Sequence, residues 1–302
     1  MSGTRDSVTV RIPGSTSNCG SGFDTLGIAL TIYNRVHLER TAGEAPIAER
    51  PADARAHSMV AEAAAAFTRE SGAAAGGFRY RIDGDVPAAR GLGSSVTIIG
   101  GILAGLNALH ATGLSRTRLV ALATAIEGHP DNASAGILGG FCVSRSHPAT
   151  QSYLGTVQFS VPDSVAFVVV SPEIELLTKE SRGALPAQIE FFDAVRSING
   201  AAYLVAAFAS GDFARLRDCG GDGIHEPYRL ARIPGGQSAI AAGIESGAWT
   251  GWLSGSGSSV LCVSDRPSAQ AVLQAMTAAF DRASVGCAGR VLSADHEGAV
   301  VE

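Results

Sequence analysis

Hydrophobic and polar residues change their spacing several times along the 302-residue chain, and each change predicts an element. Ser7 to Ile12 alternates polar and apolar side chains, which is typical of a strand with one buried face. Tyr33 to Leu38 has the same strand-like character, whereas the alanine-rich stretch from His57 to Phe67 favours a helix. We expect Pro13 to end the first strand and residues 15–18 to form a polar loop.

The residue pattern changes near Leu154, and from there on the chain favours repeated strands. The sequence predicts strands at 78–82, 157–161, 166–170, 249–253, 260–263 and 289–293, helices at 96–109, 115–127, 186–208, 237–247 and 269–283, and loops or irregular chain at 41–55, 178–182 and 219–236. A chain of this length exceeds what a single core usually supports. We therefore expect two domains, spanning residues 1–160 and 161–302.

A glycine-rich loop at Arg90 to Ser95 leads directly into the predicted helix at 96–109. The free N–H groups and the dipole at a helix N-terminus attract anions, and glycine lets the backbone approach a ligand. Ser94 and Ser95 can cap the helix, bind a phosphate oxygen or reach a metal. The spacing fits neither a Walker A loop nor a dinucleotide-binding fingerprint. The loop is either a third kind of phosphate site or an ordinary turn before a capped helix.

A second polar cluster, EGHPDN at Glu127 to Asn132, follows the predicted helix at 115–127. Gly128 should stop that helix and Pro130 should redirect the chain. Glu127 at the helix end can complete a magnesium site with a serine hydroxyl and phosphate oxygens, which are hard ligands. The alternative is a polar loop in which Asp131 caps the next helix.

Composition narrows the classes of function. The chain is 46% hydrophobic and 17% charged with a net charge of −5, and it has no basic stripe, so we expect no nucleic-acid partner. Five scattered cysteines without CxxC spacing indicate reduced thiols in a cytoplasmic protein. The longest apolar run, Val96 to Leu109, is too short to span a bilayer, and no secretory signal is expected, so we expect no membrane association.

Three separated segments, STSNCGSGFDTLG, PAARGLGSSVTIIGG and WLSGSGSSVLCV, together resemble the GHMP kinase superfamily. Within the superfamily, part of the first segment, NCGSGFDTLG, and three further motifs, EGHPDN, TKESRGALP and IHEPYR, are similar to the homoserine kinase family. The resemblance spans nearly the whole chain. It implies an α+β, two-domain GHMP kinase fold with a ribosomal-protein-like N-terminal domain, a ferredoxin-like C-terminal domain and the site in the cleft between them. It also implies a homodimer.

The resemblance further implies ATP-dependent phosphorylation of the hydroxyl of L-homoserine to O-phospho-L-homoserine, a step in threonine biosynthesis. The implied ATP-phosphate loop comprises Pro87, Arg90, Gly91, Leu92, Gly93, Ser94, Ser95, Val96 and Thr97. Mg²⁺ would be held by Ser95, or its neighbour Ser94, and Glu127. The implied substrate pocket comprises Asn18, Asp24, His129, Thr178, Arg182 and Arg229. Arg182 and Arg229 would bind the carboxylate, and Asn18 and Asp24 the amino and hydroxyl end.

Catalytic roles are expected for Asp24, Ser95, Glu127 and Arg182, and Asp24 is either a general base or only a binding group. The sequence departs from the family pattern in NCG, in GLGSSVTII, in DNASAG and in SGSGSS. These departures bear on substrate fit. Two other functions stay open: a kinase for another small carboxylate-bearing alcohol, and a catalytically silent protein that binds nucleotide or amino acid.

Overall fold

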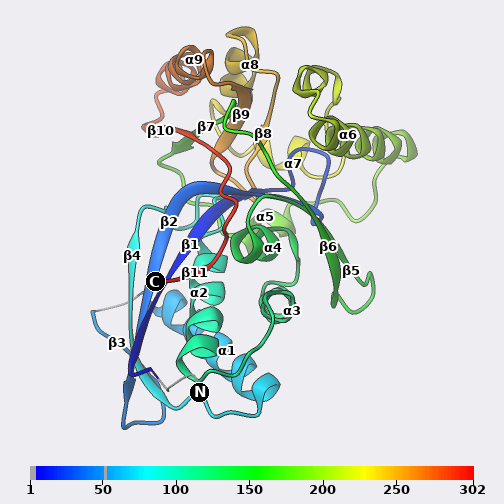
Figure 1. Cartoon of the computed structure of the whole chain (residues 1–302). Coiled ribbons are helices and arrows are strands. Elements are labelled where there is room, and N and C mark those ends of the chain that lie inside the picture. Colours follow the sequence, from blue (N-terminus) through cyan, green and yellow to red (C-terminus); the bar gives the residue numbers. More distant parts are fainter. Residues whose placement is uncertain (1–4, 51–52) are drawn as a thin grey trace.

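The computed structural model describes residues 5–50 and 53–302, which form two β-sheets with helices against them (Figure 1). The first sheet runs in the order β11-β1-β2-β4-β3, and β5 pairs with both β2 and β6. Its strands are β1 (Ser7–Ser17), β2 (Leu26–Thr41), β3 (Pro46–Ala48), β4 (Gly77–Gly84), β5 (Phe141–Ser146), β6 (Tyr153–Phe159) and β11 (Val300–Val301). Most pairs are antiparallel, whereas β3 pairs with β4 in parallel.

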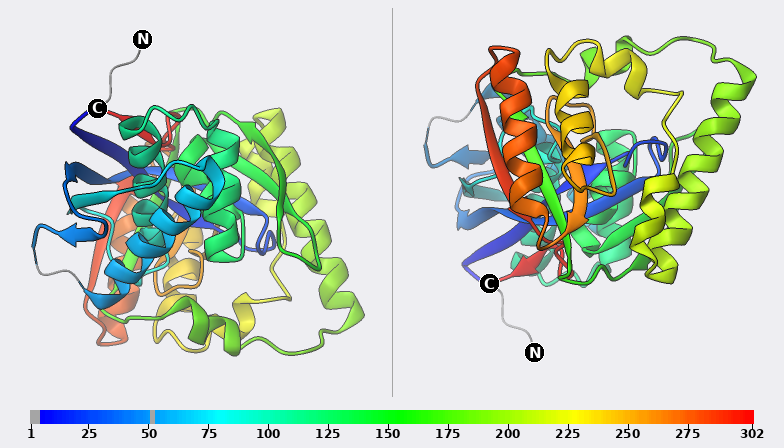
Figure 2. Two further views of the ribbon diagram at one scale, coloured as in Figure 1. Left: turned by 90° about the horizontal axis from the view of Figure 1, so that it is seen from below. Right: turned by 90° about the horizontal axis from the view of Figure 1, so that it is seen from above.

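Four helices pack on this sheet: α1 (Ala54–Ser71), α2 (Ser94–Leu109), α3 (Arg116–Glu127) and α4 (Asp131–Leu138). Helix α2 is buried almost all round because it lies between the sheet and the other helices (Figure 2). Small residues allow this close packing: a Cβ at Gly101 would stand only 2.5 Å from the Val36 side chain of β2. The helix N-terminus is thereby held at a fixed position beside the sheet.

The second sheet has four antiparallel strands in the order β10-β7-β9-β8. They are β7 (Val165–Pro172), β8 (Thr250–Leu253), β9 (Val260–Asp265) and β10 (Cys287–Leu292). Numbered within this sheet, the order is fourth, first, third, second, which is the ferredoxin-like arrangement. Helices α8 (Gly236–Glu245) and α9 (Ala269–Arg282) lie between its strands in the chain and pack on it. The predicted α+β fold with its ferredoxin-like second part is confirmed.

A long excursion separates β7 from α8. It contains α5 (Thr178–Gly183), α6 (Phe191–Ser210), the 3₁₀ helix η1 (Phe213–Asp218) and α7 (Glu226–Leu230). Helix α6 lies at one side of the molecule (Figure 2). It packs inward through Leu204 and Phe208, and the Phe208 ring lies 4.7 Å from that of Phe141 in β5. The excursion brings α5 and α7 to the junction of the two sheets.

The C-terminal segment returns to the first sheet after β10. Strand β11 pairs antiparallel with β1, with Val301 opposite Val10. Before it, the buried Asp295 accepts hydrogen bonds from the Tyr33 hydroxyl and from two backbone N–H groups. None of the helices within residues 5–50 and 53–302 combines the length and apolar character needed to cross a bilayer.

Several predicted elements were wrong in extent or type. Pro13 does not end the first strand, because a register shift between Pro13 and Ser15 lets β1 continue to Ser17. Residues 15–17 are therefore strand and not loop. The predicted surface loop at 41–55 contains β3, and the predicted loop at 178–182 is helix α5. By contrast, the bend predicted by Gly139 and Gly140 within the apolar stretch 135–143 is confirmed, because α4 ends before these glycines and β5 begins after them.

Candidate active site

Three segments that are far apart in the sequence meet between the two sheets: the end of β1, the glycine loop before α2, and the turn between β8 and β9. The N–H of Ser15 donates to the carbonyl of Leu92 at 3.0 Å, and the N–H of Gly255 donates to the carbonyl of Ser17 at 3.1 Å. The buried Ser254 hydroxyl donates to the Gly91 carbonyl at 2.7 Å. The three glycine-rich or polar motifs therefore form one connected backbone structure.

Among these three segments, the backbones approach one another most closely at Gly91. Its φ is +74°, and a Cβ there would stand 2.1 Å from the carbonyl oxygen of Ser254. Gly93 also has a positive φ and is the N-cap of α2. The expected side-chain cap by Ser94 or Ser95 was wrong, since both serines lie inside the first helical turn and no side chain caps the helix. The first-turn N–H groups are therefore available to an anion.

The remaining loop residues differ in what they present. The side chains of Leu92, Val96 and Thr97 are buried, and the Thr97 hydroxyl donates to the carbonyl of Ser94. These three residues can contribute only backbone to a ligand. Pro87 is half-buried, and Arg90 is half-buried with its guanidinium 3.7 Å from the Glu175 carboxylate.

Ser95 and Glu127 come together although 32 positions separate them. The Ser95 hydroxyl donates to Glu127 Oε2 at 3.0 Å, which joins the first turn of α2 to the end of α3. Helix α3 ends at the left-handed Gly128, as the sequence predicted, and of the two cap candidates at its start, Ser115 and Thr117, the structure has Ser115. Burial raises the pKa of Glu127, and the nearby His129 charge and the Ser95 hydrogen bond oppose that shift only in part. A hydroxyl and a carboxylate at an anion site suit a hard divalent cation.

His129 and Asp131 form a buried ion pair, with Nδ1 and Oδ1 2.5 Å apart. Burial alone would lower the pKa of His129, but the Asp131 charge and hydrogen bond outweigh it and raise the pKa to about 9. Burial likewise opposes ionisation of Asp131, and the His129 charge together with the Asn132 N–H reverses this and lowers its pKa. Asp131 stands inside α4, whose N-cap is Pro130, so the alternative of an Asp131 cap was wrong.

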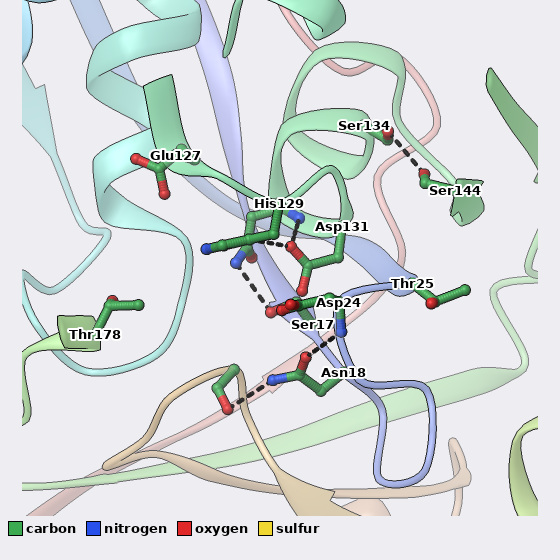
Figure 3. Close-up of polar contacts among 12 residues, drawn as sticks. Ser17, Asn18, Asp24, Thr25, Glu127, His129, Asp131, Ser134, Ser144 and Thr178 are labelled. Atoms are coloured by element: carbon green, nitrogen blue, oxygen red, sulfur yellow. Dashed lines mark hydrogen bonds and ion pairs between the residues drawn. The ribbon is translucent and has the colours of Figure 1, made fainter. Parts of the chain in front are cut away.

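The loop between β1 and β2 is strained. Asn18, Cys19 and Asp24 all have positive φ values, between 48° and 65°, which L-residues other than glycine adopt at a cost. Side chains stabilise the loop: Asn18 Nδ2 donates to the Gly255 carbonyl at 2.9 Å, and Asn18 Oδ1 accepts from the Asp24 N–H at 3.0 Å. Figure 3 shows Asn18, Asp24, His129 and Asp131 gathered together, with Glu127 and Thr178 at the edge of the group.

Two arginines lie at this loop. The half-exposed Arg182 donates to both oxygens of Asp24, at 2.7 and 2.9 Å. Arg229 is buried, and its guanidinium makes only long contacts, between 3.3 and 3.4 Å, to Ser181, Gly255 and His225. Burial and the nearby Arg182 charge lower the pKa of Arg229 to about 10. Arg229 thus has no carboxylate partner at hydrogen-bonding distance among the described residues.

Phe23 lies against both of these cations. Its ring centroid is 5.3 Å from Arg182 Cζ and 5.2 Å from Arg229 Cζ, which are cation–π distances. One ring thus interacts favourably with two like charges. Thr178 is exposed, with its hydroxyl 3.4 Å from that of Ser256. All the expected pocket residues lie around this one region.

Sequence reasoning missed some residues of the site. Asn132 accepts from the Ser15 hydroxyl at 2.8 Å and donates to the Ser17 hydroxyl at 2.9 Å, so it ties α4 to β1. Phe23 and His225 were not among the predicted site residues either. Asn132 and His225 lie inside the EGHPDN and IHEPYR motifs, which was the available signal, whereas no pattern in the sequence indicated that Phe23 lies against two cations.

Comparison with known proteins adds an independent observation. The family model for the GHMP kinases N terminal domain matches residues 58–140, and the model for the GHMP kinases C terminal domain matches residues 204–282. A homoserine kinase of Moorella thermoacetica is 37% identical over 97% of this chain and 99% of its own length. A homoserine kinase of a Synechococcus species is 36% identical over 94% of this chain and 91% of its own.

Solved structures agree with this relationship. The homoserine kinase from Cytophaga hutchinsonii superposes with a TM-score of 0.89 at 27% identity, covering all of this chain and 99% of its own. A mevalonate kinase of L. major shares the fold, with a TM-score of 0.70 at 15% identity over 98% of this chain. Sequence models, relatives and architecture converge: this chain belongs to the GHMP kinases and, within them, to the homoserine kinase family.

Proposed function

We propose that the chain transfers the γ-phosphoryl group of ATP to the hydroxyl of L-homoserine, giving O-phospho-L-homoserine and ADP as a step toward threonine. One observation carries the choice of substrate: two arginines converge over Phe23 beside Asn18 and Asp24. Two cations suit a carboxylate, and a carboxylate with an amide oxygen suits an ammonium group. An amino acid satisfies both halves of this pocket, whereas a neutral sugar satisfies neither.

The phosphates of ATP would lie on the glycine loop and the N-terminus of α2. Backbone N–H groups there would neutralise charge on the β- and γ-phosphates as the transferred group loosens from ADP. Ser95 and Glu127 would hold Mg²⁺, which supplies further neutralisation of the phosphate charge. The hydrogen bond between them supports this assignment, and a bound cation would favour the ionised carboxylate against the burial that raises the pKa of Glu127.

The roles in the substrate pocket follow from the contacts. Arg229, which is buried without a carboxylate partner among the described residues, would bind the substrate carboxylate together with Arg182. Asp24 would then bind the ammonium group. We favour this binding role over a general base, because a carboxylate held by a guanidinium is a weak proton acceptor and a loose transition state needs little base. His129 and Thr178 would complete the pocket on opposite sides.

We also infer three properties from the resemblance. The boundary between the two domains lies near residue 160, between β6 and β7, and the protein acts in the cytoplasm as a homodimer. The buried or half-buried free cysteines are compatible with a reducing compartment. Light scattering of the purified protein tests the oligomeric state, and a mass of about one chain would contradict the dimer.

A coupled ADP-release assay with ATP, magnesium and a set of alcohols tests the function. We expect turnover with L-homoserine, weaker turnover with 4-hydroxybutyrate, which lacks the amine, and the weakest with 3-aminopropan-1-ol, which lacks the carboxylate. Glu127→Gln should lower kcat about a hundredfold, since it removes the carboxylate from a cation site. Glu39→Gln is the control, because Glu39 is an exposed carboxylate of β2 that accepts a 3.2 Å hydrogen bond from Arg79.

Each arm has a contrary outcome. Turnover of mevalonate or a sugar but not of homoserine would contradict the substrate assignment. Turnover that survives in Glu127→Gln would contradict the metal assignment alone. Nucleotide binding without turnover of any alcohol would favour the silent binding protein.

A further inference from the structure

His225 is a buried histidine at the junction of the substrate loop and α7. Its side chain is fully buried, and it precedes Arg229 by one helical turn. The Nε2 atom lies 2.8 Å from the carbonyl oxygen of Gly20, and the Nδ1 atom lies 3.4 Å from a terminal nitrogen of Arg229. A carbonyl oxygen only accepts and a guanidinium only donates. Both contacts are satisfied only by a neutral imidazole whose hydrogen is on Nε2.

The charges around His225 allow this neutral form. Arg229 faces Nδ1, the Asp222 carboxylate lies 3.8 Å from Nε2, Asp24 acts from a greater distance, and the Phe23 ring lies 5.2 Å away. Burial lowers the pKa of His225. The Asp222 charge and the Gly20 hydrogen bond oppose this, yet the net shift is downward. The imidazole therefore stays neutral at physiological pH.

Asp222 holds the backbone of His225 and connects it to α6. Asp222 Oδ2 accepts from the backbone N–H of His225 at 2.6 Å, and Asp222 Oδ1 accepts from the Ser197 hydroxyl of α6 at 2.9 Å. Gly20 belongs to the strained loop that carries Asn18 and Asp24. The imidazole, which belongs to the N-cap residue of α7, thus contacts both that loop and the Arg229 guanidinium.

We propose that His225 is a positioning residue that couples Arg229 to the 18–24 loop, so that the carboxylate-binding and ammonium-binding groups keep one relative geometry. This rests on the proposed function, because it takes Arg229 as a ligand of the substrate carboxylate. The other two contacts of Arg229 have nearly the same length and come from backbone carbonyls of two separate segments, so among the described residues His225 is the side chain at hydrogen-bonding distance from this guanidinium. Without the imidazole, the guanidinium keeps its charge but loses the side chain that orients it.

Two conservative variants separate the two contacts. His225→Asn keeps an acceptor near the position of Nδ1 and loses the donor to Gly20, whereas His225→Gln keeps a donor near Nε2 and loses the acceptor for Arg229. We expect each to raise KM for homoserine about tenfold, the size of one lost hydrogen bond to a buried or charged group. His225→Leu loses both contacts and should raise it further. KM for ATP and kcat should change less than about twofold.

His110 provides a matched control. Its Nδ1 lies 3.5 Å from Arg40 and its Nε2 lies 3.0 Å from the Ala75 carbonyl, which is the same pair of partners away from the site. His110→Asn and His110→Gln should lower the melting temperature by a comparable amount and leave both KM values unchanged. This comparison separates positioning of the substrate from a general loss of packing.

A second measurement needs no turnover. Long-range ¹H–¹⁵N correlation spectra of the histidine-labelled protein, with His225→Gln used for assignment, report which ring nitrogen carries the hydrogen. We expect the Nε2–H form. A proton on Nδ1, or unchanged KM for homoserine in all three His225 variants, would overturn the proposal. If the wild-type protein does not phosphorylate homoserine, the proposed function fails, and the proposed coupling is then decided by the tautomer.

Discussion

The two sides of the site are built by different means. On the phosphate side, the backbone of the glycine loop and the N-terminus of α2 lie against the backbone of the turn after β8. On the substrate side, charged side chains arrive from the loop after β1, from α5 and from α7, and they meet around Phe23. A backbone site tolerates changes of side chain but depends on glycine and on the exact course of the backbone, whereas a side-chain site depends on which charged side chains are present.

Gly91→Ala should produce the largest effect and tests whether the phosphate side depends on backbone contact. The added Cβ would stand 2.1 Å from the Ser254 carbonyl at a φ of +74°, so the two loops must separate. We expect kcat/KM to fall about a hundredfold or more, because a displacement of about 1 Å has that effect on a reacting group. A coupled ADP-release assay at saturating homoserine and varied ATP measures kcat/KM for ATP.

The control for this substitution is Gly113→Ala. Gly113 has nearly the same φ, +71°, and a Cβ there meets nothing within 4 Å. It should cost about 1–2 kcal/mol of stability for the left-handed conformation and leave kcat/KM intact. Equal activity of the two variants would show that the close approach at Gly91 does not matter for phosphate binding.

Arg182→Gln examines the substrate side and should have an intermediate effect. Removing the guanidinium charge takes one cation from the substrate carboxylate and leaves Asp24 without its arginine partner. We therefore expect KM for homoserine to rise about tenfold to a hundredfold. KM for ATP should stay constant, and the melting temperature should change little because the Arg182 side chain is 42% exposed. Arg196→Gln, which breaks a surface pair with Asp193, is the control. A lower KM would instead show that the Arg182–Asp24 pair competes with substrate.

The His129–Asp131 pair should make the stability of the protein depend on pH. The folded pKa of His129 is raised from 6.5 to about 9, so its contribution is complete below about pH 6.5 and is lost as the pH rises toward 9. The lost stability should be on the order of 3 kcal/mol. Asp131 has a lowered pKa, so its contribution is lost only in acid. Urea unfolding between pH 6 and pH 9.5 measures the slope.

His129→Gln should flatten that slope, because glutamine cannot be protonated in this range. A wild-type protein whose stability does not fall between pH 6.5 and 9 would contradict the charged form of His129. The activity at neutral pH is not needed for this test, so it remains valid even if the variant binds homoserine weakly.

Local patterns in the sequence predicted most of the elements and the segments that form the site. The end of α3 followed from Gly128, and the glycine loop followed from its position before an apolar helix. The length of β1 could not be predicted in this way, since a bulge at Pro13 lets pairing with β2 resume. The short helix α5 was likewise beyond local propensity, because its position depends on contacts with the turn at Ser256.

Side-chain partnerships were harder to predict than segments. The family resemblance implied that Asp24 and Arg182 share a pocket, but their mutual bidentate pair depends on how the 18–24 loop folds over left-handed residues. Two serines of β1 hold Asn132, and they are in place because β1 continues past Pro13, which the sequence did not predict. Tertiary placement therefore decides which charges meet.

The return of the chain to β1 has a consequence for folding during synthesis. One edge of β1 pairs with β2, and the opposite edge is covered by β11 around Val301, almost the full length of the chain away. While the ribosome is still making the second sheet, that edge of β1 presents unpaired backbone groups, which in other proteins invite association between chains. The first sheet therefore lacks its strand on this edge until β11 has been made, and a nascent chain stalled before residue 300 would leave that edge of β1 unpaired around Val10 and Arg11.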